Sequence, residues 1–466
     1  MPQNSIIMPN TPSQNTTSKK SATRREVLAG GSAVAATAAI AATLPVSASA
    51  QVGGSDEIKV GLIGCGGRGR GAASQTLNVG KARLVAMADA FSDRLEDGFK
   101  AICTEQNKKS GNAKGEIPEN VTVEDKNKFT GFEAYNEVID KSDLVILTTP
   151  PGWRPTHFEA AVNANKNVFM EKPVAADAPG IRKVLASAEL ADEKGLKVVV
   201  GLQRRYQNSY LEAYKKAIEE GLIGKPIGAQ VYWNGGGVWT RERQPGMTEM
   251  EYQMLNWYYF TWLCGDHITE QHIHNIDVAN WFLGTTPVSA QGMGGREVRK
   301  SNTHGHIFDH HYVEFAHPNG VMVNSQCRHQ PGCFNQVREE IHGTAGICYL
   351  GNKPEIKDYD GKVLWRYRPD KSAEPNPYQV EHDHLHACIR SGEKVNNAYY
   401  GATSTMSSIL GRYATYSGKK LTYDDALEKG ADLLPKDWSW DSDPSIMPDA
   451  DGNYPVAVPG QFDPFA

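Results

Sequence analysis

The chain has few of the features that mark disulfide-rich, repetitive or nucleic-acid-binding proteins. Its 466 residues include seven cysteines, none spaced as C-x-x-C, which argues against a disulfide framework and favours small buried side chains. Lysines and arginines form no run, and the formal net charge is −5. We therefore expect no nucleic-acid partner, because phosphate contacts need clustered basic residues. With 40% hydrophobic and 22% charged residues, the composition excludes a disordered chain.

The N-terminal 50 residues have the pattern of a targeting signal and are not expected to belong to a folded core. A polar stretch over 1–22 precedes Arg24-Arg25, a modestly apolar segment over 27–46, and Ala48-Ser49-Ala50. This pattern resembles a twin-arginine export signal and predicts a periplasmic or otherwise exported protein. Glycine and threonine dilute the apolar segment, so no stable membrane span is expected after cleavage, with an uncleaved anchor as the alternative.

A glycine-rich turn follows the first strongly apolar run. The run Ile58–Ile63 leads directly into Gly64-Cys65-Gly66-Gly67-Arg68-Gly69, in which Gly64, Gly66 and Gly69 match G-x-G-x-x-G. In such a turn the first glycine permits the bend, the second lets a pyrophosphate approach the backbone, and the third lets helix and strand pack closely. The pattern predicts a dinucleotide-binding βαβ unit.

A second apolar run ends in an acid that would select the cofactor. Asp89 lies 20 residues after Gly69, where a carboxylate would bind the adenosine ribose hydroxyls and repel a 2′-phosphate. The sequence therefore favours NAD, with NADP less favoured, although the nearby Arg94 weakens that distinction.

Two further strands are expected to end near the same ligand edge. The run 143–147 precedes Thr149-Pro150, and the run 167–170 precedes Glu171-Lys172-Pro173. Ligands bind outside the carboxyl ends of such strands, so Lys172 should reach the bound cofactor.

These motifs resemble the glucose-fructose oxidoreductase, inositol dehydrogenase and MocA family, from about residue 58 to 421. The resemblance implies these cofactor-binding residues: Gly64, Gly66, Gly67, Arg68, Gly69, Asp89, Thr149, Pro150, His157, Glu171 and Lys172. It also implies a substrate domain built on a large sheet. The expected fold class is α/β, with an N-terminal Rossmann doubly wound parallel sheet and a C-terminal α+β domain whose large sheet is mainly antiparallel. The expected parts are a disordered N-terminus and signal over 1–50, the NAD-binding domain over 55–176, the substrate-binding domain over 177–430 and an extended tail over 431–466.

The segment 267–283 is predicted to form one helix that ends at Gly284. His267, Glu270, His274, Asp277 and Trp281 recur at intervals of three and four, which would place them on one face. A solvated stripe is the alternative reading, but such stripes normally contain lysine, and none occurs between Lys225 and Lys300.

In the family the matching pattern is an aspartate followed four residues later by a histidine. Here His274 fits, and Glu270 stands where the aspartate would be. We expect His274 and Lys172 to form a coupled acid/base pair, because histidine titrates near neutrality. Glu270 would orient or relay between them. No histidine pair has an established zinc spacing, so no metal site is expected.

The expected function is hydride transfer to or from a secondary hydroxyl carbon of a sugar or polyol, with a tightly bound cofactor. The expected substrate contacts are Arg204, Arg205, Tyr206, Trp262 and His274. One alternative is a redox-neutral NAD-dependent glycosidase that oxidises a ring carbon transiently. Another is a nucleotide-binding sensor without chemistry. A homo-oligomer is expected.

Overall fold

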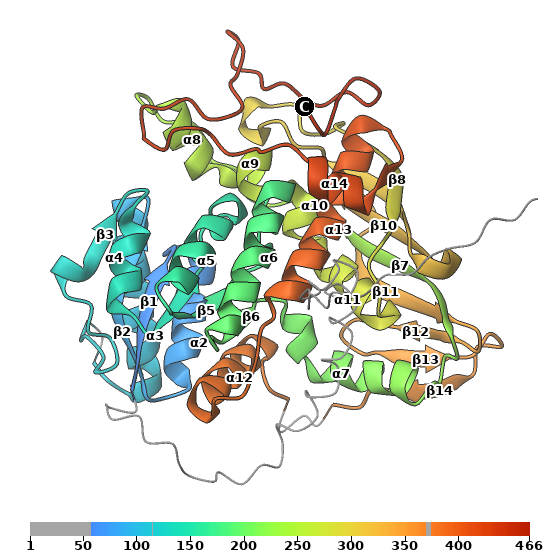
Figure 1. The fold of residues 1–466 in the computed structure, drawn as a ribbon, viewed down its shortest axis with the longest axis horizontal. Coiled ribbons are helices and arrows are strands. Elements are labelled where there is room, and N and C mark those ends of the chain that lie inside the picture. The colour runs from blue at the N-terminus through green and yellow to red at the C-terminus, as the bar shows by residue number, and fades with distance from the viewer. Residues whose placement is uncertain (1–56, 114, 370–373) are drawn as a thin grey trace, which may run out of the picture. The chain divides into compact units, whose positions relative to one another are not determined.

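The computed structural model describes residues 57–113, 115–369 and 374–466 (Figure 1). The predicted export signal lies outside the described residues. Two sheets organise the described chain, one parallel and one mixed. None of the helices in the described ranges is both long and apolar enough to cross a bilayer.

Six strands form the parallel sheet, in the order β3-β2-β1-β4-β5-β6. They are β1 (Ile58–Ile63), β2 (Ala82–Asp89), β3 (Lys128–Thr130), β4 (Leu144–Leu147), β5 (Asn167–Met170) and β6 (Val198–Val200). All four residues of β4 are buried, as expected for a parallel strand covered on both faces. The order reverses between β1 and β4, and ligands of open α/β sheets bind at this switch point, outside the carboxyl ends.

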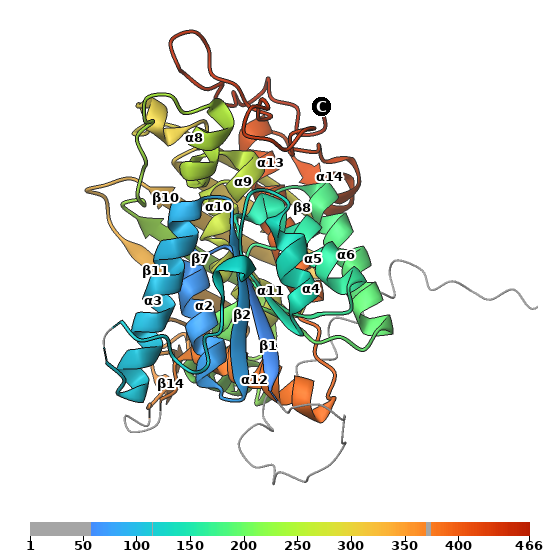
Figure 2. The same ribbon diagram turned by 90° about the vertical axis from the view of Figure 1, so that its left-hand side faces the viewer.

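Helices cover both faces of the parallel sheet. Figure 2 shows α2 (Gly67–Asn78) and α3 (Ser92–Ser110) on one side, and α4 (Ala134–Lys141), α5 (Arg154–Asn163) and α6 (Ala178–Glu193) on the other. A late helix, α12 (Pro377–Ser391), returns to pack beside α2 and β6. The last third of the chain therefore contributes to the nucleotide-binding half.

Nine strands form the second sheet, in the order β14-β13-β12-β11-β7-β10-β9-β8-β15. They are β7 (Pro226–Gly235), β8 (Ser289–Gly295), β9 (His310–Ala316), β10 (Met322–His329), β11 (Gln336–Gly343), β12 (Ile347–Tyr349), β13 (Glu355–Lys357), β14 (Val363–Arg366) and β15 (Leu421–Thr422). Every pairing is antiparallel except that of β7 with β10. Burial alternates along β10, so one face packs against a helical layer of α11 (Ile273–Leu283) and α13 (Ala398–Ser417).

Short helices and helical turns lie in the connections within and between the two halves. The α-helices among them are α7 (Asn208–Tyr214), α8 (Glu249–Leu255), α9 (Thr261–Cys264), α10 (His267–Glu270) and α14 (Tyr423–Lys429). The remaining helical turns are η2 (Asp125–Asn127), η3 (Pro151–Trp153), η4 (Gln203–Tyr206), η5 (Lys215–Glu219), η6 (Trp257–Tyr259), η7 (Asn302–His304) and η8 (Pro318–Gly320). After α14 the chain continues as residues 431–466 without a further helix or strand. We call this segment the C-terminal arm.

The predicted fold class is confirmed, and two local predictions need correction. The sequence predicts that the first domain ends at residue 176, but β6 pairs with β5 and extends the parallel sheet to Val200. The helix predicted over 267–283 is two helices, α10 and α11. The amide of His272 bonds to the carbonyl of His267, five residues earlier, and this wide turn interrupts the helix. The predicted polar stripe is therefore not one continuous helical face.

Candidate active site

The turn between β1 and α2 has the geometry that a phosphate requires. Gly64 has a φ of 96°, a value that side chains disfavour. A Cβ on Gly69 would lie 1.9 Å from the carbonyl oxygen of Gly64, whereas a Cβ on Gly66 would have no atom within 4 Å. The face of Gly66 is therefore open. The first turn of α2 contains no acidic residue, so its free amides and the positive end of the helix dipole suit an anion.

Asp89 lies at the carboxyl end of β2, beside this turn. Its carboxylate accepts hydrogen bonds from the amide of Cys65 at 2.7 Å and from that of Phe91 at 3.0 Å. Burial raises the pKa of Asp89, and the two amide bonds oppose that shift. Because each carboxylate oxygen has a second lone pair, Asp89 can still accept a ribose hydroxyl.

A buried arginine joins the turns that follow β4 and β5. Arg154 is 1% exposed, and its guanidinium donates to the backbone carbonyls of Thr149 and Pro173. Burial lowers the pKa of Arg154 to about 10, so the group remains charged at neutral pH. Arg154 was not predicted, because nothing in its sequence neighbourhood distinguishes it from a surface arginine.

The predicted cofactor residues Thr149, Pro150 and His157 lie together at this corner. Nδ1 of His157 lies 3.2 Å from the hydroxyl of Thr149, and its Nε2 is buried without a partner. Burial lowers the pKa of His157 to about 3, so the ring is neutral. A buried polar atom without a partner is costly, and its presence beside Thr149 fits a site that a ligand completes.

Arg68 and Glu171 interact with each other. Arg68 pairs with the carboxylate of Glu171, and its Nη2 lies 3.4 Å from Glu381 of α12. Both carboxylates are buried, and burial, reinforced by the charge of Glu171, raises the pKa of Glu381 well above its usual range. The alternation of acids and histidines after Glu381 is typical of a solvated helical turn. In the structure, however, α12 buries Glu381, His382 and His386 against the parallel-sheet half.

Lys172 and Glu270, predicted as catalytic partners, are in direct contact. Nζ of Lys172 donates to the backbone carbonyl of Glu270 at 2.5 Å and to its Oε1 at 2.9 Å. The two side chains are 12% and 14% exposed. Lys172 follows β5 of the parallel sheet and Glu270 ends α10, so this pair brings the two halves of the predicted site together.

His274 lies four residues after Glu270, at the start of α11, and is 8% exposed. Its Nδ1 is buried without a partner, and its ring is nearly parallel to that of Trp233, with centroids 6.0 Å apart. Burial, followed by the charges of Lys172, Arg204 and Arg68, holds the pKa of His274 well below its usual range. The imidazole is therefore neutral and able to accept a proton.

The four other predicted substrate contacts are engaged within the protein. Arg204 pairs with the buried Glu339, and Arg205 forms a bidentate pair with Asp277 at 2.9–3.2 Å. The hydroxyl of Tyr206 donates to Asn397 at 2.6 Å. Trp262 is fully buried, and its indole nitrogen donates to Gln253 at 2.7 Å, so it offers no face for a sugar. The aromatic content near residue 262 could not reveal this burial.

One group among the described residues has the composition of a metal site. One ligand atom each from Asp266, His267 and His311 lies within 4.8 Å of the others, and all three residues are buried. The oxygens of Asp266, however, already accept hydrogen bonds. Oδ1 accepts from the His267 amide and lies 2.7 Å from its ring Nδ1, and Oδ2 accepts from Phe308 at 3.1 Å and from Tyr416 at 2.5 Å.

Positive charge also lies beside this group. Nη2 of Arg299 lies 2.6 Å from the ring of His329, and that ring stacks on His267 with centroids 4.5 Å apart. An occupied carboxylate and a neighbouring guanidinium favour a buried hydrogen-bond network over a cation site. The absence of a metal stays a prediction.

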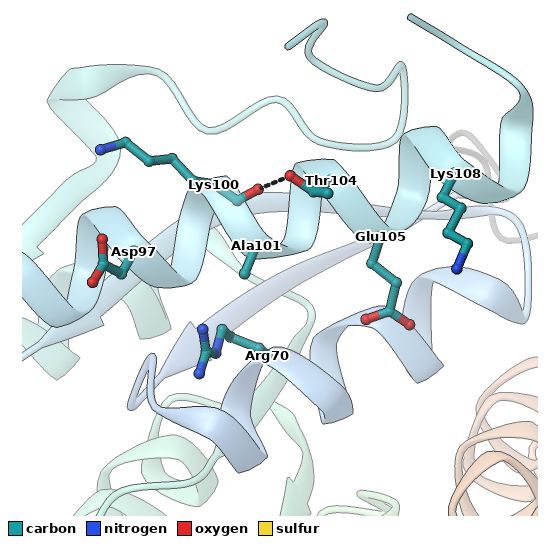
Figure 3. A pocket seen from close by; sticks show the side chains of 7 residues that line it. All are labelled: Arg70, Asp97, Lys100, Ala101, Thr104, Glu105 and Lys108. Carbon is teal, nitrogen blue, oxygen red and sulfur yellow. Dashed lines mark hydrogen bonds between the residues drawn. The ribbon is translucent and has the colours of Figure 1, made fainter. Parts of the chain in front are cut away.

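A surface hollow occurs elsewhere on the nucleotide-binding half. It lies between α2 and α3 and is lined by Arg70, Asp97, Lys100, Ala101, Thr104, Glu105 and Lys108 (Figure 3). None of these is a predicted site residue, and the charges of both signs give the hollow no preference for an anion.

Comparisons with known proteins match both halves. The model described as "Oxidoreductase family, NAD-binding Rossmann fold" matches residues 58–202, and the one described as "GFO/IDH/MocA C-terminal domain" matches 211–349. The chain is 27% identical over 365 residues to an inositol 2-dehydrogenase of Agrobacterium fabrum, covering 75% of this chain and 92% of that one.

Two more relatives show the range of similarity. Identity to an inositol 2-dehydrogenase of Klebsiella pneumoniae is 32% over 219 residues, 46% of this chain and 57% of that one. The chain thus spans little more than half the length of that relative. A scyllo-inositol dehydrogenase from Lactobacillus casei, solved with NAD(H) and scyllo-inositol, shares the fold with a TM-score of 0.56 and 19% identity, covering 79% of this chain and 99% of that one.

Proposed function

Because the chain belongs to the GFO/IDH/MocA oxidoreductase family, whose N-terminal domain is an NAD-binding Rossmann fold, we propose that it is an NAD-dependent dehydrogenase for a secondary hydroxyl of a sugar or polyol. The contact of Lys172 with Glu270, next to the neutral His274, carries the proposal. Relatives matched over most of the chain include inositol 2-dehydrogenases, which supports a polyol-like substrate.

The residues at the site fit the cofactor. The open face of Gly66 and the free amides of α2 would hold the pyrophosphate, and Asp89 would hold the adenosine ribose. The carboxylate of Asp89 favours NAD over a cofactor with a 2′-phosphate, because it would repel that phosphate. When bound, NAD supplies the hydride acceptor.

Side chains of the protein would accept the hydroxyl proton and stabilise the substrate oxygen. As the carbinol C–H bond breaks and the hydride leaves, the hydroxyl O–H proton passes to neutral His274, leaving a ketone. Lys172 would donate a hydrogen bond to the substrate oxygen and stabilise the negative charge that develops there. Glu270 holds Lys172 in place through its carboxylate and its backbone carbonyl.

We also propose that the protein is exported in folded form through the twin-arginine route and that it assembles as a homo-oligomer. The Arg24-Arg25 pair and the Ala48-Ser49-Ala50 site support export. Fractionation of cells expressing the wild type and an R24K/R25K variant tests export, and light scattering of the purified protein tests assembly. Retention of both proteins in the cytoplasm would contradict the export proposal.

Replacing Lys172 by methionine tests the catalytic assignment. K172M should keep NAD affinity but lower kcat for polyol oxidation by roughly 100-fold or more, the usual contribution of a positioned acid or base. K128M is the matched control, because the Lys128 side chain is also 12% exposed and paired with a carboxylate, but lies on β3. Normal turnover by K172M would remove Lys172 from the mechanism.

Substrate assays separate the net dehydrogenase from a redox-neutral glycosidase. A panel of polyols and sugars with added NAD should give NADH. p-Nitrophenyl glycosides without added NAD should release no phenol. Phenol release that K172M abolishes would favour the glycosidase, and neither reaction from a folded, NAD-bound protein would favour a sensor.

A further inference from the structure

The C-terminal arm crosses the ligand edge of the parallel sheet. Figure 1 shows this dark red segment running from α14 across to α8, on the side where α9 and α10 lie. The arm is tied down at separate points by hydrogen bonds. The amide of Leu433 donates to Asp177 at 3.0 Å, the hydroxyl of Thr248 donates to the carbonyl of Trp440 at 2.6 Å, and Gln253 donates to the carbonyl of Ile446 at 2.6 Å.

Two tryptophans of the arm contact aromatic rings at that edge. The ring of Trp440 lies 5.1 Å from that of Phe91 and 4.5 Å from that of Phe132, and Trp438 lies 3.8 Å from Trp153, measured between centroids. Phe132 also stacks on Trp153 at 5.2 Å. These contacts join the arm to the nucleotide-binding half.

The rings that Trp440 contacts stand in the turns after the strands that should surround an adenosine. Phe91 lies two residues after Asp89, the last residue of β2, and Phe132 lies two residues after Thr130, the last residue of β3. The amide of Phe91 donates to the Asp89 carboxylate that we assign to the ribose. Phe91, Phe132 and Trp440 are each only partly buried, so their rings keep accessible surface. Bases stack readily on such aromatic faces.

We propose that Phe91, Phe132 and Trp440 form the binding wall for the adenine base, and that the C-terminal arm closes the adenosine end of the dinucleotide site. This inference rests on the proposed function, because it assumes that NAD is the ligand. It adds a residue from the far end of the chain to a site otherwise built by the Rossmann half. Exchange of the cofactor then requires the arm to move, which would keep NAD bound during export.

The placement of Trp440 makes a test specific for the adenine end possible. We would measure binding of NAD, ADP-ribose and nicotinamide mononucleotide by calorimetry, and release of NAD by stopped flow. W440L should weaken NAD and ADP-ribose alike by about ten-fold, the typical cost of losing one base stack. Affinity for nicotinamide mononucleotide, which lacks the adenine, should not change. Release of NAD should accelerate by a similar factor.

Two further variants control for folding and for general loosening of the arm. W440F keeps an aromatic face and should largely restore binding. F465L removes another aromatic side chain of the arm, whose ring lies 6.4 Å from Tyr413, and should leave ADP-ribose affinity unchanged. Equal ADP-ribose affinity in the wild type and W440L would overturn the proposal, as would an equal loss in F465L. If the wild type itself binds neither NAD nor ADP-ribose, the proposed function fails instead.

Discussion

Replacing Glu270 by glutamine would remove one charge from the pair that joins the two halves of the site, with little change in shape. Nζ of Lys172 and Oε1 of Glu270 are 2.9 Å apart, a distance at which unit charges attract by about 6 kcal/mol at an effective dielectric constant of about 20. Desolvation of both ions offsets most of this attraction. The net loss should therefore match that of a hydrogen bond to a charged group, about 1.5–3 kcal/mol.

The backbone carbonyl of Glu270 should limit the loss of stability in E270Q. It still accepts from Lys172 in the variant, so the ammonium is not left without a partner. We expect E270Q to fold, with its free energy of unfolding lowered by that amount in urea titrations. Its kcat should fall by about 100-fold, because Lys172 loses the carboxylate that positions it.

A surface pair provides the comparison. Lys128 bonds to Glu96 at 3.1 Å, but Glu96 is 46% exposed and Lys128 also pairs with Asp125. Exposed pairs contribute less than about 1 kcal/mol, so E96Q should change little in stability or turnover. If E270Q is no less stable and no slower than E96Q, the reasoning about the buried pair is refuted.

The remaining predictions concern the glycine turn and the buried histidines. G69A should lose both stability and NAD affinity, because its Cβ would lie 1.9 Å from the Gly64 carbonyl oxygen. G66A should fold normally, because its Cβ would have no atom within 4 Å. It should nevertheless bind NAD poorly in calorimetry, because the added methyl group would stand where the pyrophosphate approaches the backbone. A G66A variant with wild-type affinity would contradict the assignment of the pyrophosphate. Burial lowers the pKa values of His157 and His272 to about 3, so their unfolded forms bind protons first as the pH falls below about 6.5. The contribution of the two neutral rings to the free energy of unfolding should be fully present above that pH. Below it, the free energy of unfolding should decrease by about 1.4 kcal/mol per pH unit for each ring. Urea titrations at pH 7.5 and 5.5 check this, and equal stability of the wild type at both would count against neutral buried rings.

The sequence predicted the features that depend on local pattern. The strand before Gly64, the acid at the end of β2 and the lysine after β5 could be placed because strand ends and glycine turns have local signatures. From the family pattern, Glu270 was expected to orient or relay between Lys172 and His274. The structure brings Glu270 into contact with Lys172, and the catalytic roles stay a prediction. The change from aspartate to glutamate did not prevent this contact.

Features that depend on distant partners could not be predicted. Arg68 reaches Glu381, 313 residues away, and no local pattern indicates that such a pair is buried. The break between α10 and α11 arises from a hydrogen bond of His272 to His267, although the residue spacing there is compatible with a continuous helix. Trp262 was an expected substrate contact. Only its burial and its hydrogen bond to Gln253 show that it belongs to a core.

Arg154 constrains how this enzyme scaffold could be redesigned. Its guanidinium donates to the backbone carbonyl of Thr149 after β4 and to that of Pro173 after β5. The loop beside the expected cofactor and the loop that carries Lys172 are therefore held by the same side chain. An engineer who reshapes one loop to accept another nucleotide would displace the other and misplace the lysine. Changes of substrate preference are better sought on the α10 and α11 side, where the backbone is not tied to this arginine.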